Sequence, residues 1–264
     1  MTTQRRGTAL ITGASSGLGE EFAWQLAVRH HDLVLVARRE DRLRALQHRL
    51  EQAAAISVQV LPADLATAAG RAVVAERITH PTAAPVGLVV NNAGFGLGQR
   101  FVDGDLQRER DAIAVMITAV MELSHAAASA MIPRGRGAIL NVSSMVADTA
   151  MGTYAAAKAW VKTFTEALAG ELAGTGVSAT AVSPGLVRTE FHAAAQMDDT
   201  AWPAIGWLTA EQVVTAALAA VRRGQIHVVP SLRYRALQSV LQHSPRPLVR
   251  TLGGPGLWER AITR

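Results

Sequence analysis

The sequence predicts an α/β protein whose single domain is built on a doubly wound parallel sheet of about seven strands. Two observations lead to this prediction. Short and almost entirely apolar segments recur along the chain, as expected for strands that are covered on both faces. Longer segments with helical spacing lie between them, and regular alternation of strand and helix is typical of a parallel sheet. The length of 264 residues suffices for one large domain with a full core.

The predicted strands are short apolar runs bounded by turn residues, at 8–12, 33–37, 56–61, 87–91, 137–142, 177–182 and 226–229. The predicted helices lie between them, at 18–30, 40–54, 65–79, 104–132, 153–173 and 209–223. Ligands of such sheets bind beyond the carboxyl ends of the strands, so a functional site is expected in the loops that follow the strands. Residues 184–208 have no clear periodicity, and long loops of this kind are often substrate lids.

Composition excludes several classes of protein. The absence of cysteine excludes disulfides and thiolate chemistry and fits a reducing cytoplasm. No apolar run reaches the roughly 18 residues that span a bilayer. The N-terminal MTTQRRGTAL leads directly into a strand and has no signal-peptide pattern. We therefore expect a cytoplasmic protein without stable membrane insertion.

The net charge of +5 belongs to the end of the chain. Residues 231–264 contain six arginines and one acid, whereas residues 1–230 have no net charge. We therefore separate a domain, 1–230, from a basic C-terminal extension, 231–264. A basic extension can contact nucleic acid or an anionic membrane surface. The alternative, which we favour, is a solvated or subunit-facing helix, so no nucleic-acid partner is expected.

A glycine-rich loop, TGASSGLG, follows the first predicted strand and precedes a helix. Glycines let a backbone turn tightly and approach a pyrophosphate, and the helix N-terminus offers free N–H groups. This placement at the start of a β-α-β unit predicts a Rossmann-type dinucleotide site, although a purely structural turn has the same composition. The residues expected at the cofactor are Gly13, Ser15, Ser16, Gly17, Leu18 and Gly19.

The end of the second predicted strand indicates which dinucleotide is bound. An acidic residue there would accept hydrogen bonds from the ribose 2′-hydroxyl of NAD, but this position holds Ala37. Two arginines follow, and a guanidinium suits a 2′-phosphate. We expect NADP(H), with Arg38 as the main contact and Arg39 assisting. The alternative is that both arginines are surface charges that begin the next helix.

Tyr154 and Lys158 are four residues apart and share one face of a predicted helix after the fifth strand. Reduction of a carbonyl needs a proton donor at the oxygen while hydride attacks the carbon. The pKa of a free tyrosine is about 10, and a nearby ammonium group favours the phenolate. Lys158 and Lys162 are the only lysines of the chain. This spacing is common by chance, but its place in a nucleotide-binding sheet favours catalysis.

These motifs together resemble the short-chain dehydrogenase/reductase family: TGxxxGxG, NNAG at Asn91 to Gly94, YxxxK, and a Pro184-Gly185 pair followed by Thr189. The resemblance covers about residues 7–230, with the motifs in the family's order. It implies that Lys158 also contacts the nicotinamide ribose. It further implies cofactor contacts along the loops after the later strands, at Asp64, Leu65, Asn91, Ala93, Gly94, Pro184, Gly185, Val187 and Thr189. Asp64 could instead cap the following helix.

Two positions depart from the family pattern. The catalytic serine of the family precedes the tyrosine by about thirteen residues, whereas Ser144 precedes Tyr154 by ten. Alignment from the strand side still selects Ser144, with Ser143 as the rival, and leaves the intervening loop three residues short. We expect an open or reshaped substrate wall. Met116 stands where the family often has an asparagine that holds a water for a proton relay; core filling is the alternative.

The sequence thus predicts an NADP(H)-dependent oxidoreductase of the carbonyl reductase or alcohol dehydrogenase type, without a metal. Apolar side chains predict a pocket for a hydrophobic or aromatic ketone or aldehyde, at Phe95, Met145, Met151 and Trp202. The two departures keep a non-catalytic NADP(H)-binding or sensing protein as an alternative. Helices 104–132 and 153–173 are alanine-rich and, by resemblance, pair subunits, so a homodimer or homotetramer is expected.

Overall fold

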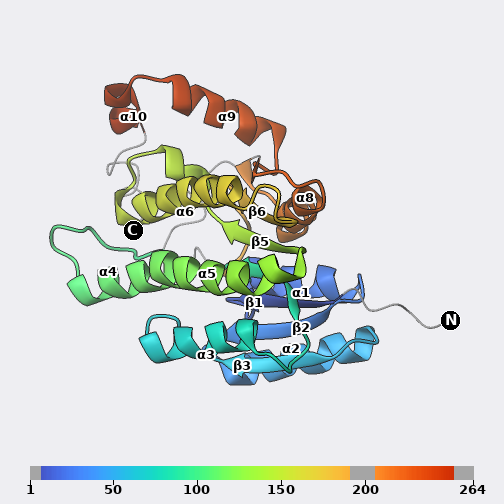
Figure 1. Cartoon of the computed structure of the whole chain (residues 1–264). Coiled ribbons are helices and arrows are strands. Elements are labelled where there is room, and N and C mark those ends of the chain that lie inside the picture. The colour runs from blue at the N-terminus through green and yellow to red at the C-terminus, as the bar shows by residue number, and fades with distance from the viewer. Residues whose placement is uncertain (1–6, 191–205, 253–264) are drawn as a thin grey trace.

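A computed structural model describes residues 7–190 and 206–252 and shows a layered α/β domain (Figure 1). Its seven strands are all parallel, and β3-β2-β1-β4-β5-β6-β7 is their order in the sheet. Their bounds are β1 Thr8–Thr12, β2 Asp32–Ala37, β3 Val58–Pro62, β4 Val86–Asn91, β5 Gly137–Val142, β6 Val177–Val182 and β7 His227–Val228. The predicted doubly wound sheet is confirmed.

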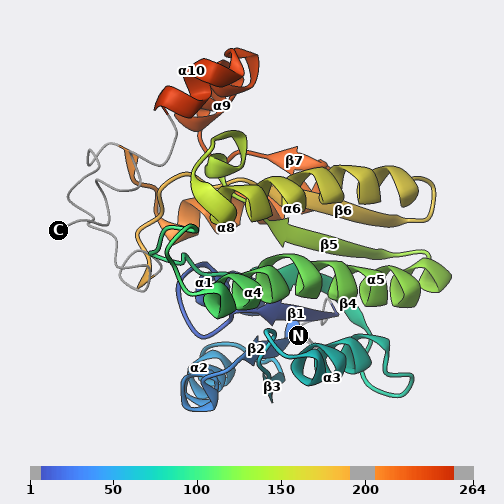
Figure 2. The same ribbon diagram turned by 90° about the vertical axis from the view of Figure 1, so that its left-hand side faces the viewer.

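Helices cover both faces of the sheet (Figure 2). Alternate residues of a strand point to opposite faces, so Ala9 and Ile11 pack into one core and Leu10 into the other. Burial on both faces explains why the strands are continuous apolar runs. One face carries α1 Gly17–Ala27, α2 Glu40–Ala53 and α8 Ala210–Arg222; the other carries α3 Ala68–Thr79, α5 Ala119–Met131 and α6 Gly152–Glu171.

The long helix expected at 104–132 is interrupted. A π-helical turn, Ala114–Thr118, joins α4 (Leu106–Ile113) to α5, and its buried side chains include Met116. Such turns insert an extra residue into a helix and are frequent at functional sites. By length and composition alone this rod, Leu106–Arg134, could cross a membrane, but half of its most apolar window is buried inside the protein. The rod is therefore a core helix with one side exposed at the surface of the domain.

Two helices that the sequence analysis did not predict follow β7. They are α9 (Leu232–His243) and α10 (Arg246–Leu252), and they lie beyond α6 in Figure 1. Their residues line the large cleft described below, so this part of the basic extension belongs to the walls of the domain. Apolar Tyr234, Leu237 and Leu241 recur at helical spacing, which gives α9 a face that can pack.

Candidate active site

One large cleft, of about 990 Å³, lies at the carboxyl ends of the strands. Loops that follow β1 to β6 line it on one side, and α9 and α10 line it on the other. These loops converge because all strands of the sheet run in the same direction. The residues predicted from the sequence are therefore brought together from positions far apart in the chain.

The glycine-rich loop packs against the turn after β4. Gly13 has φ +67°, and a Cβ added there would lie 2.9 Å from the Cα of Ala93, so only glycine fits. The Thr12 hydroxyl accepts hydrogen bonds from the backbone N–H groups of Asn92 and Ala93, at 3.0 and 3.1 Å. This packing leaves Ser15, Ser16, Gly17 and Leu18 along the cleft, at the start of α1. Gly19 supports the loop from behind, because a Cβ there would meet the carbonyl oxygen of Gly13.

Arg38 and Arg39 both line the cleft at the end of β2. Arg39 Nη2 donates to the hydroxyls of Ser15, at 3.0 Å, and Ser16, at 3.3 Å, which links this guanidinium to the glycine-rich loop. Arg38 is exposed and has no hydrogen bond or ion pair within the described part of the chain. The two arginines therefore differ: Arg39 shapes the loop, and Arg38 is available for a ligand.

The residues after β3 and β4 are placed differently from one another. Asp64 and Leu65 line the cleft; Asp64 Oδ1 accepts from the N–H of Ala66, while Thr67 caps α3. After β4, the cleft is lined by Asn92, Ala93 and Gly94. Asn91 does not line it.

Asn91 belongs instead to a buried polar chain across the sheet. Its amide nitrogen donates to Ser124 Oγ at 3.1 Å and to Asn141 Oδ1 at 2.9 Å, and Asn141 in turn donates to Thr165. Asn141 is fully buried, so the residue thirteen positions before Tyr154 does not face the cleft. The two asparagines hold β4, β5 and α6 together.

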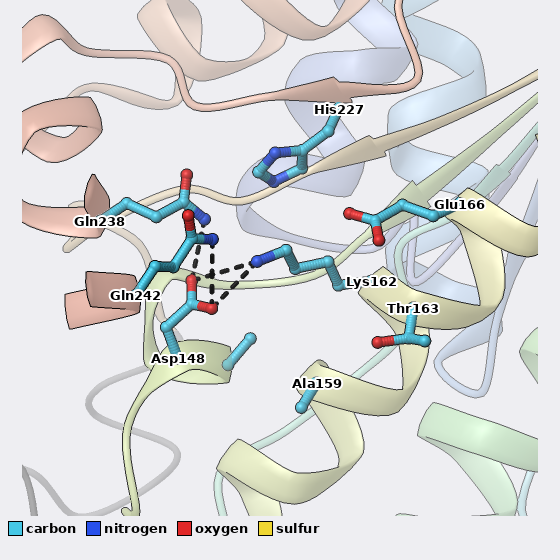
Figure 3. A pocket seen from close by; sticks show the side chains of 9 residues that line it. Asp148, Ala159, Lys162, Thr163, Glu166, His227, Gln238 and Gln242 are labelled. Atoms are coloured by element: carbon cyan, nitrogen blue, oxygen red, sulfur yellow. Dashed lines mark hydrogen bonds and ion pairs between the residues drawn. The ribbon is translucent and has the colours of Figure 1, made fainter. Parts of the chain in front are cut away.

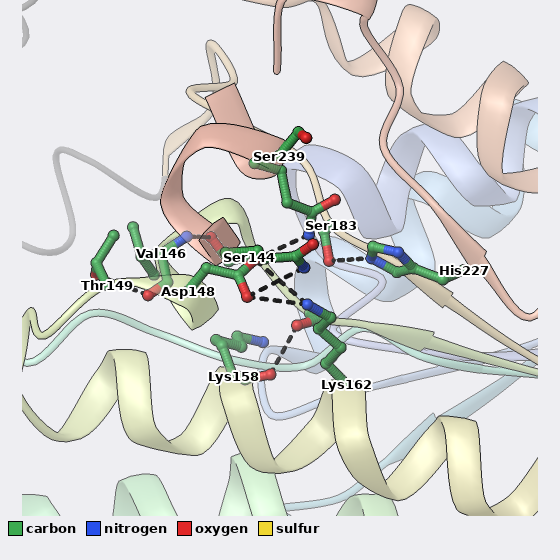
Figure 4. A network of polar contacts seen from close by, with 12 residues as sticks. Ser144, Val146, Asp148, Thr149, Lys158, Lys162, Ser183, His227 and Ser239 are labelled. Atoms are coloured by element: carbon green, nitrogen blue, oxygen red, sulfur yellow. Dashed lines mark hydrogen bonds and ion pairs between the residues drawn. The ribbon is translucent and has the colours of Figure 1, made fainter. Parts of the chain in front are cut away.

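The two serines after β5 have different partners. Figure 4 shows Ser144 hydrogen-bonded to Val146 in the turn that follows it. Ser143 is buried and donates to the backbone carbonyl of Lys158 at 2.7 Å, which anchors α6. Ser144 lines the cleft and forms a hydrogen bond with Tyr154. It also caps the 3₁₀ turn Met145–Asp148 that fills the shortened loop. The structure therefore places Ser144, and not Ser143, beside the tyrosine.

Tyr154 and Lys158 lie on the cleft side of α6, with the ammonium 5.7 Å from the ring centroid. Burial raises the pKa of Tyr154 above its ordinary value, and the hydrogen bond with Ser144 acts in the opposite direction but does not prevail. Burial also lowers the pKa of Lys158 to about 8. Lys158 Nζ donates to the carbonyl of Val142 at 2.8 Å. The expected lowering of the tyrosine pKa by Lys158 is not seen in this arrangement, because burial dominates.

Met116 lies behind this pair. A Cβ added at Gly94 would lie 3.4 Å from Met116 Cγ and 3.4 Å from Lys158 Nζ, so all three groups meet at one point. Met116 belongs to a small apolar cluster with Leu97 and Ala157 that also supports Tyr154. The thioether cannot donate a hydrogen bond. The side chain therefore fills space where the family pattern has an amide.

The far wall of the cleft combines expected and unexpected residues. Phe95, Met145 and Met151 line it, as do Pro184, Gly185, Val187 and Thr189. Trp202, which was also predicted to line the pocket, lies outside the described residues. The sequence analysis missed the wall formed by α9 and α10, which includes Tyr234, Leu237, Val240, Leu248 and Val249. The helical spacing of these apolar residues indicates a packed helix face. The arginines around them instead led us to expect a solvated or subunit-facing helix.

Tyr234 fixes α9 to the loop after β6. Its hydroxyl donates to the carbonyl of Gly206 at 2.7 Å and accepts from the N–H of Leu186 at 3.1 Å. A Cβ at Gly185 would clash with the ring of Tyr234. The glycine that the family motif places here thus also makes room for the helix.

The cleft combines a glycine-rich loop suited to a dinucleotide with a serine, a tyrosine and a lysine at one end. This combination is typical of a class of dehydrogenases. The short chain dehydrogenase family model matches residues 7–200, and the chain belongs to this family. An uncharacterized oxidoreductase of Myxococcus xanthus (strain DK1622) is 35% identical over 70% of this chain and 74% of the relative. Another, of Staphylococcus aureus (strain N315), is 32% identical over 75% and 86%.

Solved structures give the same assignment. A short-chain dehydrogenase from Sphingobium yanoikuyae in complex with NADPH matches with a TM-score of 0.82 and 36% identity, over 89% of this chain and 94% of that one. A bulky-bulky ketone specific alcohol dehydrogenase from Comamonas testosteroni matches with a TM-score of 0.78 and 31% identity, over 92% and 96%. The chain is therefore an oxidoreductase of the short-chain type.

Proposed function

We propose that this protein reduces bulky hydrophobic ketones with NADPH, as a carbonyl reductase or, in the reverse direction, an alcohol dehydrogenase. One observation carries the proposal: Ser144, Tyr154 and Lys158 lie in the same apolar-lined cleft as Arg38. A hydride-transfer site needs a cofactor position and a proton donor at adjacent points, and this cleft offers both.

The residues fit NADP(H) by their chemistry. The start of α1, an eleven-residue helix, borders the cleft at Gly17, with the side chain of Thr189 beside it. Its N–H groups and dipole suit a pyrophosphate. Arg38 would hold the 2′-phosphate, with Arg39 beside it, and Asp64 would border the adenine. Gly94, beside Lys158, and Val187 would border the nicotinamide end, and Thr189, beside Gly17, would border the pyrophosphate.

The chain's own residues provide the acid chemistry. A bound NADPH would supply the hydride for the carbonyl carbon. Ser144 orients the carbonyl oxygen, and Tyr154 donates the phenol proton to it. Because burial keeps the phenol protonated at neutral pH, Tyr154 is ready to act as the donor in the reduction direction. Lys158 holds its ammonium at the carbonyl of Val142, next to the ring.

The substrate class follows from the walls. Met145, Met151 and Phe95 lie near the tyrosine end, and Leu237 and Val240 of α9 face the same space. Apolar side chains at this end of the cleft favour hydrophobic substituents over a sugar phosphate. The likeness to the bulky-bulky ketone specific alcohol dehydrogenase from Comamonas testosteroni supports the same substrate class.

The test is a panel of ketones of increasing size, assayed by NADPH consumption, with Tyr154→Phe as the matched variant. The variant should lose at least about a hundredfold in kcat, because it removes the general acid. Its NADPH affinity should stay within about threefold, because the phenol does not hold the phosphates. Tight NADPH binding without turnover of any ketone would instead favour a sensing protein. A variant as active as the wild type would assign the chemistry to another group.

A further inference from the structure

The shortened loop after Ser144 ends in a carboxylate that joins three elements. Asp148 closes the 3₁₀ turn Met145–Asp148, and its oxygens accept hydrogen bonds from Lys162 Nζ at 2.9 and 3.3 Å. Lys162 lies on α6, two helical turns beyond Tyr154. From α9, Gln238 donates to Asp148 at 2.8 Å and Gln242 at 3.5 Å. Figure 3 shows the four side chains converging.

Three of the four side chains are little exposed, although the four border a cavity of about 470 Å³ and Gln242 is exposed. The side chains of Asp148 and Lys162 are 14% and 13% exposed, and Gln238 is 8% exposed. Burial alone would raise the pKa of Asp148, but the hydrogen bonds from Gln238 and Lys162 outweigh it and lower the pKa. The carboxylate is therefore charged and fully engaged, and charge-assisted hydrogen bonds of this kind hold geometry strongly.

A neighbouring side of α9 faces the cleft. Leu237, Val240 and Leu241 line the same cleft as Ser144 and Tyr154, while Gln238 and Gln242 point to Asp148. Near its other end, α9 is tied through Tyr234 to Gly206 and Leu186. The helix is thus fastened at two points, to the loop after β6 through Tyr234 and to Asp148 through Gln238 and Gln242, and it forms an outer wall of the cleft.

We propose that Asp148 is a positioning residue for substrate size: it fixes α9 so that the apolar wall meets the distal substituent of a bulky ketone. This inference rests on the proposed function. A small ketone would sit between Ser144 and Tyr154 without reaching Leu237 or Val240, so the position of α9 matters little for it. A bulky ketone gains its binding from that wall and depends on the wall being held in place.

The experiment compares wild type with Asp148→Ala, Asp148→Asn and the control Asp103→Ala, whose carboxylate is exposed and does not line the cleft. Asp148→Ala should raise KM for a bulky aryl ketone about tenfold, as expected for losing charge-assisted hydrogen bonds. KM for a small aliphatic ketone, kcat for that ketone and the NADPH dissociation constant should stay within about threefold. For Asp148→Asn, which keeps an acceptor oxygen, KM for the bulky ketone should lie between the values of wild type and Asp148→Ala. The control variant should have the KM of wild type.

Amide hydrogen exchange gives a readout that does not depend on turnover. Residues 232–243 should exchange faster in Asp148→Ala, and residues 17–27 should exchange as in wild type. Faster exchange with unchanged size selectivity would overturn the specificity assignment. Unchanged exchange of residues 232–243 would overturn the positioning assignment. An equal rise in KM for both ketones together with weaker NADPH binding would overturn it as well. A wild type that reduces no ketone overturns the proposed function and the specificity with it, while the exchange data still decide whether Asp148 holds α9.

Discussion

At the scale of single residues, the two arginines after β2 illustrate how similar side chains are separated by their contacts. Arg39 is already committed to Ser15 and Ser16, and its guanidinium lies 3.9 Å from Glu190. The Arg38 side chain has no hydrogen bond or ion pair within the described residues. The coenzyme preference is therefore expected to depend mainly on Arg38, because a phosphate can pair with it without breaking an existing contact.

Replacement of Arg38 tests this expectation directly. Arg38→Asp should raise KM for NADPH by about tenfold to a hundredfold, as expected for one charge-assisted pair. KM for NADH, which has no 2′-phosphate, should change much less. Initial rates with both coenzymes measure the ratio, and Arg42→Asp, on the neighbouring helix turn, serves as the control. An unchanged ratio would mean that the 2′-position is read elsewhere.

The burial of Lys158 leads us to expect that the free energy of unfolding depends on pH. Its pKa is lowered from 10.5 to about 8 in the folded chain. Between these values the unfolded chain binds more protons, so the free energy of unfolding rises with pH in this range. The gain is complete above the unfolded value and is lost as pH falls through about 8. Lys158→Met should lack the rise, whose slope is at most about 1.4 kcal/mol per pH unit. The free energy of unfolding of both proteins is measured by urea denaturation at several pH values. If it depends on pH in the same way in both, Lys158 remains hydrated in the folded chain.

At the scale of elements, strands were easier to predict than the walls of the site. Periodicity gave β5 and β6 with the observed bounds, because strands buried on both faces leave an unambiguous apolar run. Ser144 was selected because counting began at the strand, and the burial of Asn141 explains why counting back from the tyrosine fails. Local sequence does not specify the π-helical turn at Met116 or the docking of α9. Both depend on contacts between distant segments, such as Asp148 with Gln238.

The start of α6 depends on a buried carboxylate that the sequence analysis overlooked. Glu109 of α4 is 4% exposed, and it accepts from the Thr153 hydroxyl at 2.6 Å and from Gln99 at 3.0 Å. Thr153 directly precedes Tyr154. Glu109→Ala would leave both donors unpaired and should lower the free energy of unfolding by about 2–3 kcal/mol.

Urea denaturation of this variant is best compared with Glu40→Ala, which removes an exposed ion pair with Arg44 and should cost at most about 1 kcal/mol. Because Glu109 secures the residue next to Tyr154, kcat should also fall while NADPH affinity is retained. Equal losses of stability in the two variants would show that Glu109 contributes no more than a surface charge.

At the scale of the whole molecule, the rod formed by α4 and α5 leaves apolar side chains uncovered. Leu106, Ile113, Met121 and Ile132 are each about half exposed, although the opposite side of the rod is buried in the core. Nearby on α6, Trp160 and Phe164 stack with centroids 4.7 Å apart. Exposed apolar side chains along an otherwise well-packed element indicate an association surface.

We expect a second copy of the chain to cover this surface, giving a homodimer or a homotetramer. The rod passes a length and composition test for a membrane helix, but half of its most apolar window is already buried in the domain, so insertion would require unfolding the core. Met121→Glu places a charge in the expected interface and should shift the molar mass from light scattering toward the monomer. Leu232→Glu, a similar change at an exposed leucine of α9, should leave the assembly intact. A wild type that is monomeric at all concentrations, or an assembly broken only by the α9 change, would place the contact elsewhere.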